Sequence, residues 1–189
     1  RNYTNGVKLS WLSGDLDTWG LTGWRQRFVE HLPFVNGPHT QKNLGFAFGQ
    51  NIYTPRDISR EPPDPKDRPY AGWSYLEFAF ISKTDSVMDT FSIQVGMVGR
   101  HSYAQDTQRV VHKWLDDERP QGWDHQVGDE LGVNLVYEHK LRLYARTLGH
   151  DFGIDFTPSA GASLGNVQTF ANAGFTTRFG YNLPSDFGV

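Results

Sequence analysis

Seven segments of this 189-residue chain alternate, residue by residue, between large apolar side chains and small or polar ones. In segment 90–99, TFSIQVGMVG, apolar residues stand at the odd positions from Phe91 to Met97, and Ser, Gln and Gly stand between them. A period of two is that of a β-strand, whose side chains point to opposite faces of a sheet. The other segments are 3–13, 43–53, 73–82, 132–146, 152–165 and 167–182. We therefore expect an all-β protein.

The polar faces of these strands indicate a barrel with a hydrated interior. In segment 167–182, Asn172, Thr176 and Arg178 share one face, and in the dry core of a sandwich each would need a buried partner. Strands of about nine or more residues match the length that a tilted strand needs to cross a membrane. A mean hydropathy of −0.55 fits, because a barrel alternates lipid-facing and lumen-facing residues. The expected fold is an antiparallel, up-and-down transmembrane β-barrel.

Composition excludes several kinds of chemistry. The chain has no cysteine, so disulfides, thiol nucleophiles and thiolate metal sites are absent. A net charge of −3 gives no overall field that favours nucleic acid, and we expect no nucleic-acid partner. The sequence contains no glycine-rich phosphate loop, no G-x-S-x-G turn and no H-E-x-x-H motif. Histidine, carboxylate and amide side chains remain as the candidates for a functional site.

Two irregular regions and one helix interrupt the strands. Residues 14–43 are too long for a hairpin turn and predict a surface loop with a helical piece. Residues 54–69 are rich in proline, which cannot join a strand ladder, and predict a loop. The pattern over 103–119 predicts a helix, and its apolar residues form a stripe available for packing: Val110, Val111, Trp114 and Leu115.

The polar positions of this helix allow two interpretations. Gln108 and His112 stand four residues apart and therefore share a face. They form either a packed polar turn or a catalytic histidine with an orienting amide. The carboxylates of Asp116, Asp117 and Glu118 oppose the helix dipole, so this cluster is either a solvated charge run or a site for a hard cation.

Other polar and aromatic residues near the helix are candidates for the membrane surface. Trp123 fits an interfacial aromatic belt. Basic residues of the proline-rich loop and the helix would form one basic rim if the two segments meet: Arg60, Lys66, Arg68, Arg109 and Lys113. For Arg68 alone, a surface salt bridge is favoured over a contact with phosphate.

As a set, six motifs closely resemble the lipid A 3′-O-deacylase family of Gram-negative outer membranes. They are YTNG at 3–6, GQNIYTP at 49–55, DRPYAGW at 67–73, QRVVH at 108–112, GWDHQVGDE at 122–130 and LGNVQTFANAGFTTRFGYNLPSDFG at 164–188. The resemblance covers essentially the whole chain. It implies a barrel of about 12 strands that hydrolyses, with calcium, the ester holding the 3′-linked acyloxyacyl group of lipid A.

Carried over residue by residue, the resemblance implies a catalytic set and a metal site. The family's essential histidine falls on His112, its glutamine on Gln108 and its early threonine on Thr4. Its acidic metal-site residue falls on Glu118, with Asp116 and Asp117 as rivals, and Thr4 belongs to the same Ca²⁺ shell. Basic residues suited to the phosphates of lipid A would be Arg60, Lys66 and Arg68.

The resemblance also implies that residues 1–189 form a single barrel domain that is incomplete. The family carries an Asn-Asp pair on a strand before the YTNG segment, and seven strands leave sheet edges that lipid cannot satisfy. We therefore expect a fragment that lacks the first strand and the C-terminal strands.

We hypothesise that the protein is a monomeric, calcium-dependent hydrolase in the outer membrane of a Gram-negative bacterium, in which His112 activates water. Its partners would be lipid A, as part of lipopolysaccharide, and the surrounding membrane lipids. One alternative is a non-enzymatic barrel that acts as a porin or adhesin. A second is a soluble, sugar- or lipid-binding sheet domain.

Overall fold

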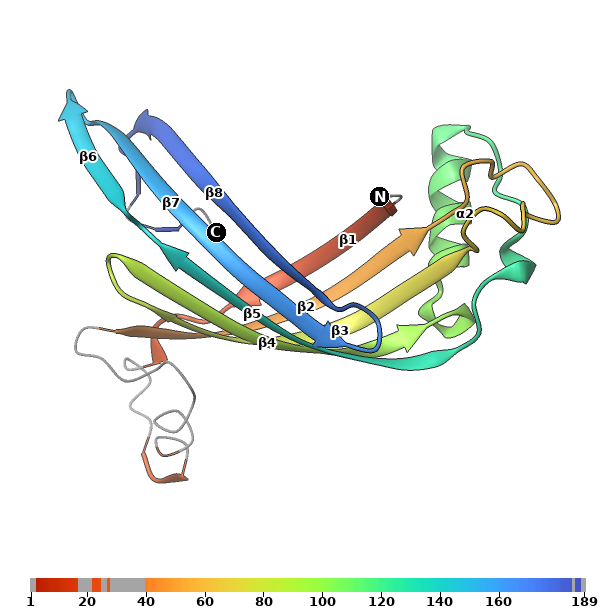
Figure 1. The fold of residues 1–189 in the computed structure, drawn as a ribbon, viewed down its shortest axis with the longest axis horizontal. Helices are drawn as coiled ribbons and strands as arrows, with labels where there is room; N and C mark the ends of the chain where they lie inside the picture. Colours follow the sequence, from red (N-terminus) through yellow and green to blue (C-terminus); the bar gives the residue numbers. More distant parts are fainter. Residues whose placement is uncertain (1–2, 17–21, 25–26, 28–39, 185, 188–189) are drawn as a thin grey trace.

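The computed structural model describes residues 3–16, 22–24, 27, 40–184 and 186–187, and these form one antiparallel sheet of eight strands. The strands are β1 (Tyr3–Leu12), β2 (Gln41–Tyr53), β3 (Ala71–Lys83), β4 (Val87–Val98), β5 (Glu130–Leu141), β6 (Tyr144–Gly149), β7 (Phe152–Gly165) and β8 (Phe170–Tyr181). β1 to β5 pair in sequence order, and β7 pairs with β5, β6 and β8. Figure 1 shows that the sheet curls into an open trough. The predicted antiparallel all-β architecture is confirmed.

Strand register lines up the apolar residues of the convex face in rows. Phe46 pairs with Phe78, Phe78 with Ile93, and Ile93 with Leu135. The rings of Phe46 and Phe78 meet edge to face, with their centroids 5.2 Å apart. Three of these four side chains are more than a third exposed. A continuous exposed apolar surface of this kind is what the outer wall of a membrane barrel presents to lipid.

The concave face carries a chain of polar side chains that runs from β1 to β5. The ammonium group of Lys8 donates to both carboxylate oxygens of Glu77, at 2.9 and 3.0 Å. The amide nitrogen of Gln94 donates to Glu77 at 2.8 Å, and that of Asn134 donates to Gln94 at 3.2 Å. Glu77, Gln94 and Asn134 are buried. Buried polar groups that satisfy one another in this way hold neighbouring strands together.

The segment predicted as one strand over 132–146 is two strands in the structure. β5 ends at Leu141 and β6 begins at Tyr144. Between them the backbone N–H of Arg142 turns to the carbonyl of Ser86, at 2.8 Å, and its guanidinium donates to the carbonyl of Asp85, at 2.9 Å. Arg142 therefore binds the turn between β3 and β4 and interrupts the ladder. The alternation of apolar and polar side chains in the sequence does not predict such a break.

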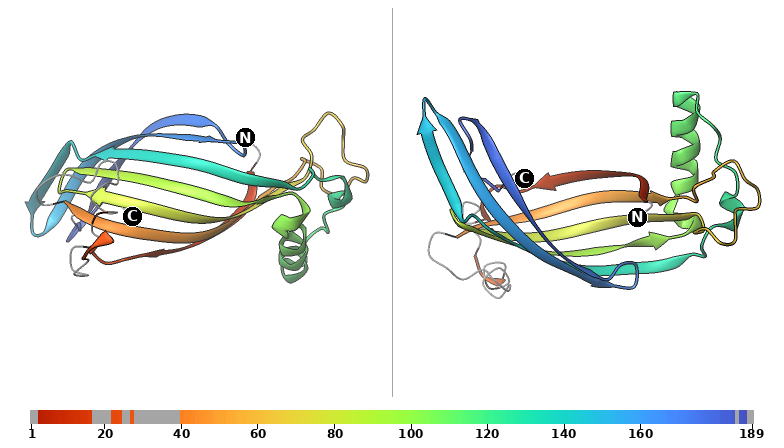
Figure 2. Two further views of the ribbon diagram at one scale, coloured as in Figure 1. Left: turned by 90° about the horizontal axis from the view of Figure 1, so that it is seen from below. Right: turned by 45° about the horizontal axis from the view of Figure 1, so that its top comes forward.

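The long connections divide between the two ends of the sheet. One end, the α2 rim, is formed by residues 54–70, 99–129 and 166–169 and holds the helices η2 (Arg100–Ser102), α2 (Ala104–Leu115) and η3 (Trp123–His125). Figures 1 and 2 show α2 standing across the end of the sheet. Most of the predicted 14–43 loop lies outside the described residues. Within the described residues, no helix has the length and apolarity needed to span a membrane.

The helix is shorter than the 103–119 expected from the sequence. α2 ends at Leu115 because Asp116 takes a left-handed conformation, with φ 52°, and the next N–H, that of Asp117, donates to the carbonyl of His112 at 3.0 Å. A left-handed residue directly after the last turn is a common way to end a helix. The acidic residues therefore lie beyond the helix and not in its last turn.

Candidate active site on the α2 rim

Gln108 lies on the inward face of α2, and a buried tryptophan fixes its amide. Its side chain is 4% exposed and Trp123 is 1% exposed. The indole N–H of Trp123 donates to the Gln108 carbonyl oxygen at 2.8 Å. Because that oxygen is identified as the acceptor, the amide NH₂ of Gln108 must point the other way, along α2.

Trp123 belongs to a small core beneath α2, so the prediction that it sits in an interfacial belt is wrong. Its ring packs against Tyr70 with centroids 4.8 Å apart, and Ile52 and Ala104 complete the cluster. The physical reason is the turn at Gly122, whose φ of 77° folds the chain back and directs Trp123 inward. Tyr70 in turn donates its hydroxyl to the carbonyl of Ile58 at 3.2 Å.

The two ring nitrogens of His112 have different partners. Nδ1 lies 2.6 Å from the backbone carbonyl oxygen of Glu118. A carbonyl only accepts, so Nδ1 carries the proton and the lone pair of the neutral ring is on Nε2. Nε2 lies 3.4 Å from the amide nitrogen of Gln108. The hydrogen bond at Nδ1 therefore sets the direction of the basic nitrogen. The His112 side chain is 15% exposed, so it remains accessible to solvent.

Two hydrogen bonds therefore hold this site, one from Trp123 to the Gln108 oxygen and one from His112 Nδ1 to the Glu118 carbonyl. The indole fixes the amide, and the carbonyl fixes the orientation and tautomer of the imidazole. This arrangement is that of a histidine prepared to accept a proton at Nε2. It favours the catalytic interpretation of Gln108 and His112 over a packed polar turn.

The acidic residues after α2 hold different positions around His112. The carboxylate of Asp117 lies 3.8 Å from Nδ1 and accepts the backbone N–H of Glu118 at 2.8 Å. Glu118 contacts the ring through its carbonyl, and all three acidic residues, Asp116 included, are exposed. In the described part of the chain, no three His, Asp or Glu side chains gather as a metal site.

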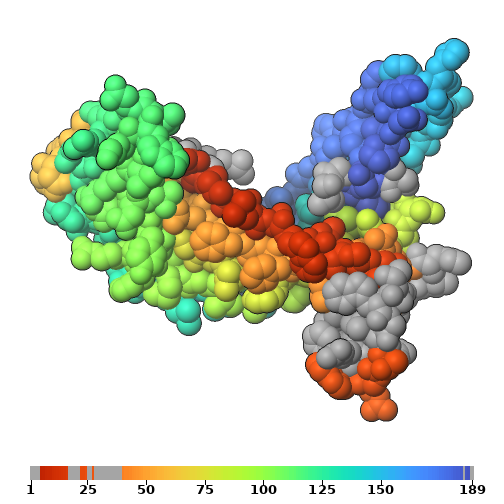
Figure 3. All heavy atoms as spheres, turned by 180° about the vertical axis from the view of Figure 1, so that it is seen from behind, coloured from red at the N-terminus to blue at the C-terminus, as the bar shows by residue number. Residues whose placement is uncertain are grey.

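Thr4 lies in β1 at the same end of the sheet as α2. Its neighbours Tyr3 and Asn5 pair with Tyr53 and Ile52, so the register skips at Thr4 and marks a β-bulge. Figures 1 and 3 both show the start of β1 beside the segment that contains α2. The fold therefore brings Thr4 and the Gln108–His112 pair to one rim, although more than 100 residues separate them in sequence.

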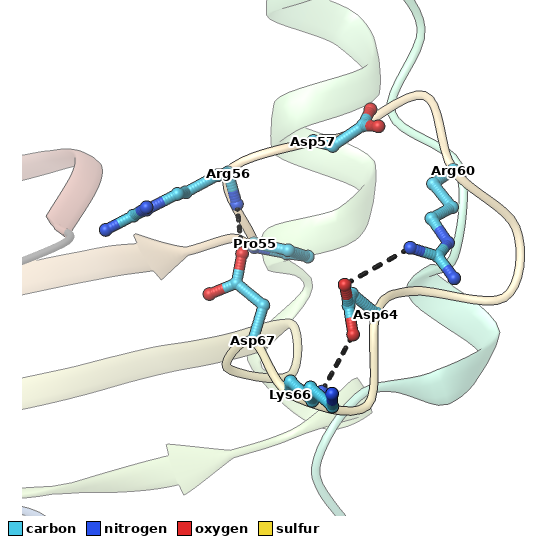
Figure 4. A pocket seen from close by; sticks show the side chains of 7 residues that line it. All are labelled: Pro55, Arg56, Asp57, Arg60, Asp64, Lys66 and Asp67. Atoms are coloured by element: carbon cyan, nitrogen blue, oxygen red, sulfur yellow. Dashed lines mark hydrogen bonds and ion pairs between the residues drawn. The ribbon is translucent and has the colours of Figure 1, made fainter.

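The predicted basic residues of the proline-rich loop lie among carboxylates. Arg60 and Lys66 line a cavity of about 460 Å³ together with acidic side chains. Figure 4 shows these side chains around the cavity. Arg60 pairs with Asp64 at 3.2 Å. Backbone N–H groups, first that of Arg56, donate to Asp67 and hold its pKa below the usual value, so this carboxylate stays charged.

The remaining members of the predicted basic rim have other surroundings. Arg68 donates its Nε to the carbonyl of Thr54. The proline-rich loop contacts the segment after α2, where the N–H of Gln121 donates to Ile58 at 2.7 Å. Arg109 and Lys113 are exposed on α2. The cations therefore do not form one uniform basic surface.

Two further side chains of the α2 rim, Asp129 and Tyr70, have shifted pKa values. His101 donates its backbone N–H to Asp129 at 2.9 Å and places its ring Nδ1 2.7 Å from the same carboxylate. The backbone hydrogen bond is the main reason that the pKa of Asp129 is lowered. Burial raises the pKa of Tyr70 to about 12, with the carboxylate of Glu61 adding to the effect.

Comparison with known proteins decides the family. A profile of the family described as "Outer membrane protein LpxR" matches residues 1–189, the whole chain. The chain belongs to the LpxR family. The resemblance inferred from the sequence motifs is therefore confirmed, and the protein is located in the outer membrane.

A solved structure of this family supports the fold. LpxR from Salmonella typhimurium superposes with a TM-score of 0.71 at 20% sequence identity, and the match covers 93% of this chain. It covers 52% of the Salmonella LpxR chain, so the present chain spans about half the length of that relative. No individual curated protein sequence matches significantly. At this identity the superposition shows the barrel wall and says nothing of activity.

The sequence indicates His112 and Gln108 as candidates but does not predict the contacts that hold them. The Trp123 indole donates to a residue 15 positions earlier, and no local spacing predicts such a contact. Glu118 acts on His112 through a backbone carbonyl, which every residue possesses. The Gly-Trp pair at 122–123 was the available signal, because a glycine before a large aromatic allows a turn that buries the ring.

Proposed function

We propose that this protein is a calcium-dependent carboxylic ester hydrolase that removes the 3′-O-linked acyloxyacyl chain from lipid A of lipopolysaccharide. The observation that carries the proposal is the fixed orientation of His112, whose Nδ1–H is bound to a carbonyl and whose Nε2 is left basic. The histidine lies on the rim of a sheet from an outer-membrane family. An ester at the membrane surface is the substrate that such a residue can reach.

The proposed reaction needs only water as the nucleophile. His112 Nε2 accepts a proton as the water oxygen attacks the ester carbonyl carbon. When the tetrahedral intermediate collapses, the bond from the acyl carbon to the sugar oxygen breaks, and the protonated imidazole returns its proton to that oxygen. The products are a free acyloxyacyl fatty acid and a sugar hydroxyl. A positioned base of this kind typically contributes about 10²- to 10⁴-fold in rate.

Gln108 has a positioning role in this proposal. Its amide NH₂, aimed along α2 by Trp123, lies 3.4 Å from Nε2. That separation is longer than a normal N–H···N hydrogen bond, and a water molecule bound by both groups would be held in front of the base. Thr4, across the rim, is assigned to the same catalytic set.

Calcium dependence is proposed from the family, and the described residues do not make a calcium site by themselves. Calcium takes six to eight oxygen ligands. The exposed carboxylate of Glu118 and the hydroxyl-bearing Thr4 have suitable chemistry, but the described residues bring no three acidic or histidine side chains together. The proton transfers of the proposed reaction are therefore assigned to His112 alone.

We assign the phosphates of lipid A to the proline-rich loop. Arg60 and Lys66 line the cavity of Figure 4, and Arg68 braces the start of the loop. Because Asp64 already pairs with Arg60, a phosphate must compete with a carboxylate for the guanidinium. Because of this competition, we expect the site to select a correctly placed phosphate and not to bind anions tightly in general.

We further propose that the trough is one wall of a closed barrel. Of the described strands, β1 pairs only with β2, and β8 only with β7. Edges of this kind need partner strands in lipid.

The test is product analysis with the full-length protein in detergent or vesicles. Purified lipopolysaccharide is incubated with Ca²⁺ or with a calcium chelator, and lipid A is analysed by mass spectrometry. We expect loss of one acyloxyacyl group with Ca²⁺ and none with chelator. Unmodified lipid A under both conditions, together with ion conductance across a planar bilayer, would instead support a porin.

A further inference from the structure

The large apolar side chains of α2 are mostly exposed, unlike those of a helix that packs on a protein core. Thr107, Val110 and Trp114 follow the spacing 3-4 on α2 and share one flank. Tyr103, the residue before the helix, adjoins this flank, because it lines a crevice together with Thr107. Tyr103 is 63% and Trp114 is 81% exposed, whereas the polar Gln108 is buried. Three of the four residues of the apolar stripe, Val110, Trp114 and Leu115, are therefore exposed. A different flank carries charged residues at the same spacing: Asp106, Arg109 and Lys113.

The apolar flank continues the convex wall of the sheet. A crevice of about 660 Å³ separates the first turn of α2 from the outer faces of β1 to β4. Tyr103 and Thr107 line it from the helix side, and Val7, Phe48 and Leu76 line it from the strand side. The three strand residues lie on the same convex face as the exposed apolar rows.

The start of α2 is held firmly against this wall. A Cβ atom built at Gly72 in β3 would lie 2.0 Å from the hydroxyl of Ser102, which shows how closely η2 approaches the strand. Gln50 of β2 donates its amide to the carbonyl of Ser102 at 2.8 Å. Figure 2 shows α2 rising from this attachment at the end of the sheet. The orientation of its flanks is therefore set by the barrel wall.

We propose that the flank of α2 defined by Tyr103, Thr107, Val110 and Trp114 lies in the acyl-chain region of the outer leaflet and anchors the helix at the membrane surface. The protein is an outer-membrane protein, so hydrocarbon covers the strand wall with which this flank is continuous. An exposed apolar flank beside a charged flank is the pattern of an interfacial helix, and tryptophan favours that interface.

Acyl chains are the occupant because they already cover the adjacent surface. A second copy of the chain would have to displace them from both the wall and the helix. The anchor would also fix the depth of the inward face of α2, and therefore of His112, relative to the lipid surface. The anchoring itself depends on the outer-membrane location and not on the proposed hydrolysis.

Residues 1–189 contain no cysteine, so labels can be placed at chosen positions once any cysteine elsewhere in the full-length protein has been replaced by serine. Single cysteines at Val110 and Trp114, with matched controls at Asp106 and Lys113, are spin-labelled in the full-length protein in phosphatidylethanolamine–phosphatidylglycerol vesicles. Collision with lipid-soluble oxygen is compared with collision with a water-soluble nickel chelate. We expect oxygen to dominate at 110 and 114 and nickel to dominate at 106 and 113. Folding of each variant is checked by its gel mobility with and without heating.

Two outcomes would overturn the proposal. Nickel-dominated collision at all four positions would place the helix in water. Exclusion of both reagents at 110 and 114, with spin–spin broadening that grows with protein density, would identify a second copy of the chain as the occupant. Because the readout is spectroscopic, an inactive protein that still shows oxygen-dominated labels would refute the hydrolase assignment alone.

Discussion

Removing the indole N–H of Trp123 tests the network that orients the candidate catalytic residues. The substitution Trp123→Phe keeps an aromatic ring against Tyr70 but deletes the donor that lies 2.8 Å from the Gln108 oxygen. Both side chains are buried, so the oxygen is left without that donor in a dry site. An unsatisfied buried acceptor costs about 1–3 kcal/mol. The smaller ring adds a cavity cost of its own.

The loss should appear as easier local opening of α2. At about 1.4 kcal/mol for each factor of ten, a cost of about 1–3 kcal/mol raises the population of the open form roughly five- to 150-fold. Amide hydrogen exchange of residues 108–115, followed by mass spectrometry on the folded protein, measures this directly. We expect protection of these amides to fall by that factor, while the strands keep theirs.

Two variants separate the hydrogen bond from a general effect of losing an indole. Trp114→Phe makes the same chemical change at an exposed position of α2 and keeps an aromatic ring in the flank proposed to face lipid, so it should leave exchange nearly unchanged. Replacing both partners, Trp123→Phe with Gln108→Leu, should recover part of the protection, because no unpaired acceptor remains. Equal exchange in Trp123→Phe and Trp114→Phe would refute the reasoning.

Three further predictions concern the α2 rim. The raised pKa of Tyr70 means that the folded state favours the neutral phenol. Its contribution to folding stability is therefore full below pH 10.0 and is lost as the pH rises through about 12. The ultraviolet titration difference between wild type and Tyr70→Phe should show this late ionisation, and a midpoint near 10 would contradict it. The lowered pKa of Asp129 means that its contribution to folding stability is present above pH 3.8 and is lost as the pH falls through the lower pKa of the folded state. Proteolysis of the 99–129 connection should rise with acid in wild type and change less in Asp129→Asn. Identical pH profiles of proteolysis would count against the His101 contact. Asp116→Gly relieves a left-handed residue, with φ 52°, at a typical gain of about 1 kcal/mol, so exchange at the end of α2 should slow about five-fold, and faster exchange would be the opposite result.

The sheet could be predicted from the sequence because each strand has two chemically different environments. Alternation gave the faces of β2, β3 and β4, and the register then placed Phe46, Phe78 and Ile93 in one row. The break between β5 and β6 could not be predicted, because Arg142 makes it through backbone carbonyls on another turn.

The helix could be predicted from the sequence, but the direction in which its apolar residues face could not. An apolar stripe normally faces a core, and that rule assumes that water surrounds the protein. On the outside of a membrane barrel the apolar side faces lipid instead, which leaves the Gln108 face to pack inward against Trp123. Trp123, expected in the interfacial belt, is buried because of the turn at Gly122, while Trp114 is exposed.

The most direct test of the proposed function is the rate of lipid A deacylation by His112→Ala. Wild type, His112→Ala and His101→Ala are folded in the same vesicles with Ca²⁺, and the initial release of acyloxyacyl fatty acid is measured by mass spectrometry. His101 is a matched control, because it also lies on the α2 rim and contacts a carboxylate, that of Asp129, at 2.7 Å. We predict a loss of about 10²- to 10⁴-fold for His112→Ala and a near wild-type rate for His101→Ala. Release by folded His112→Ala at the wild-type rate would contradict the account.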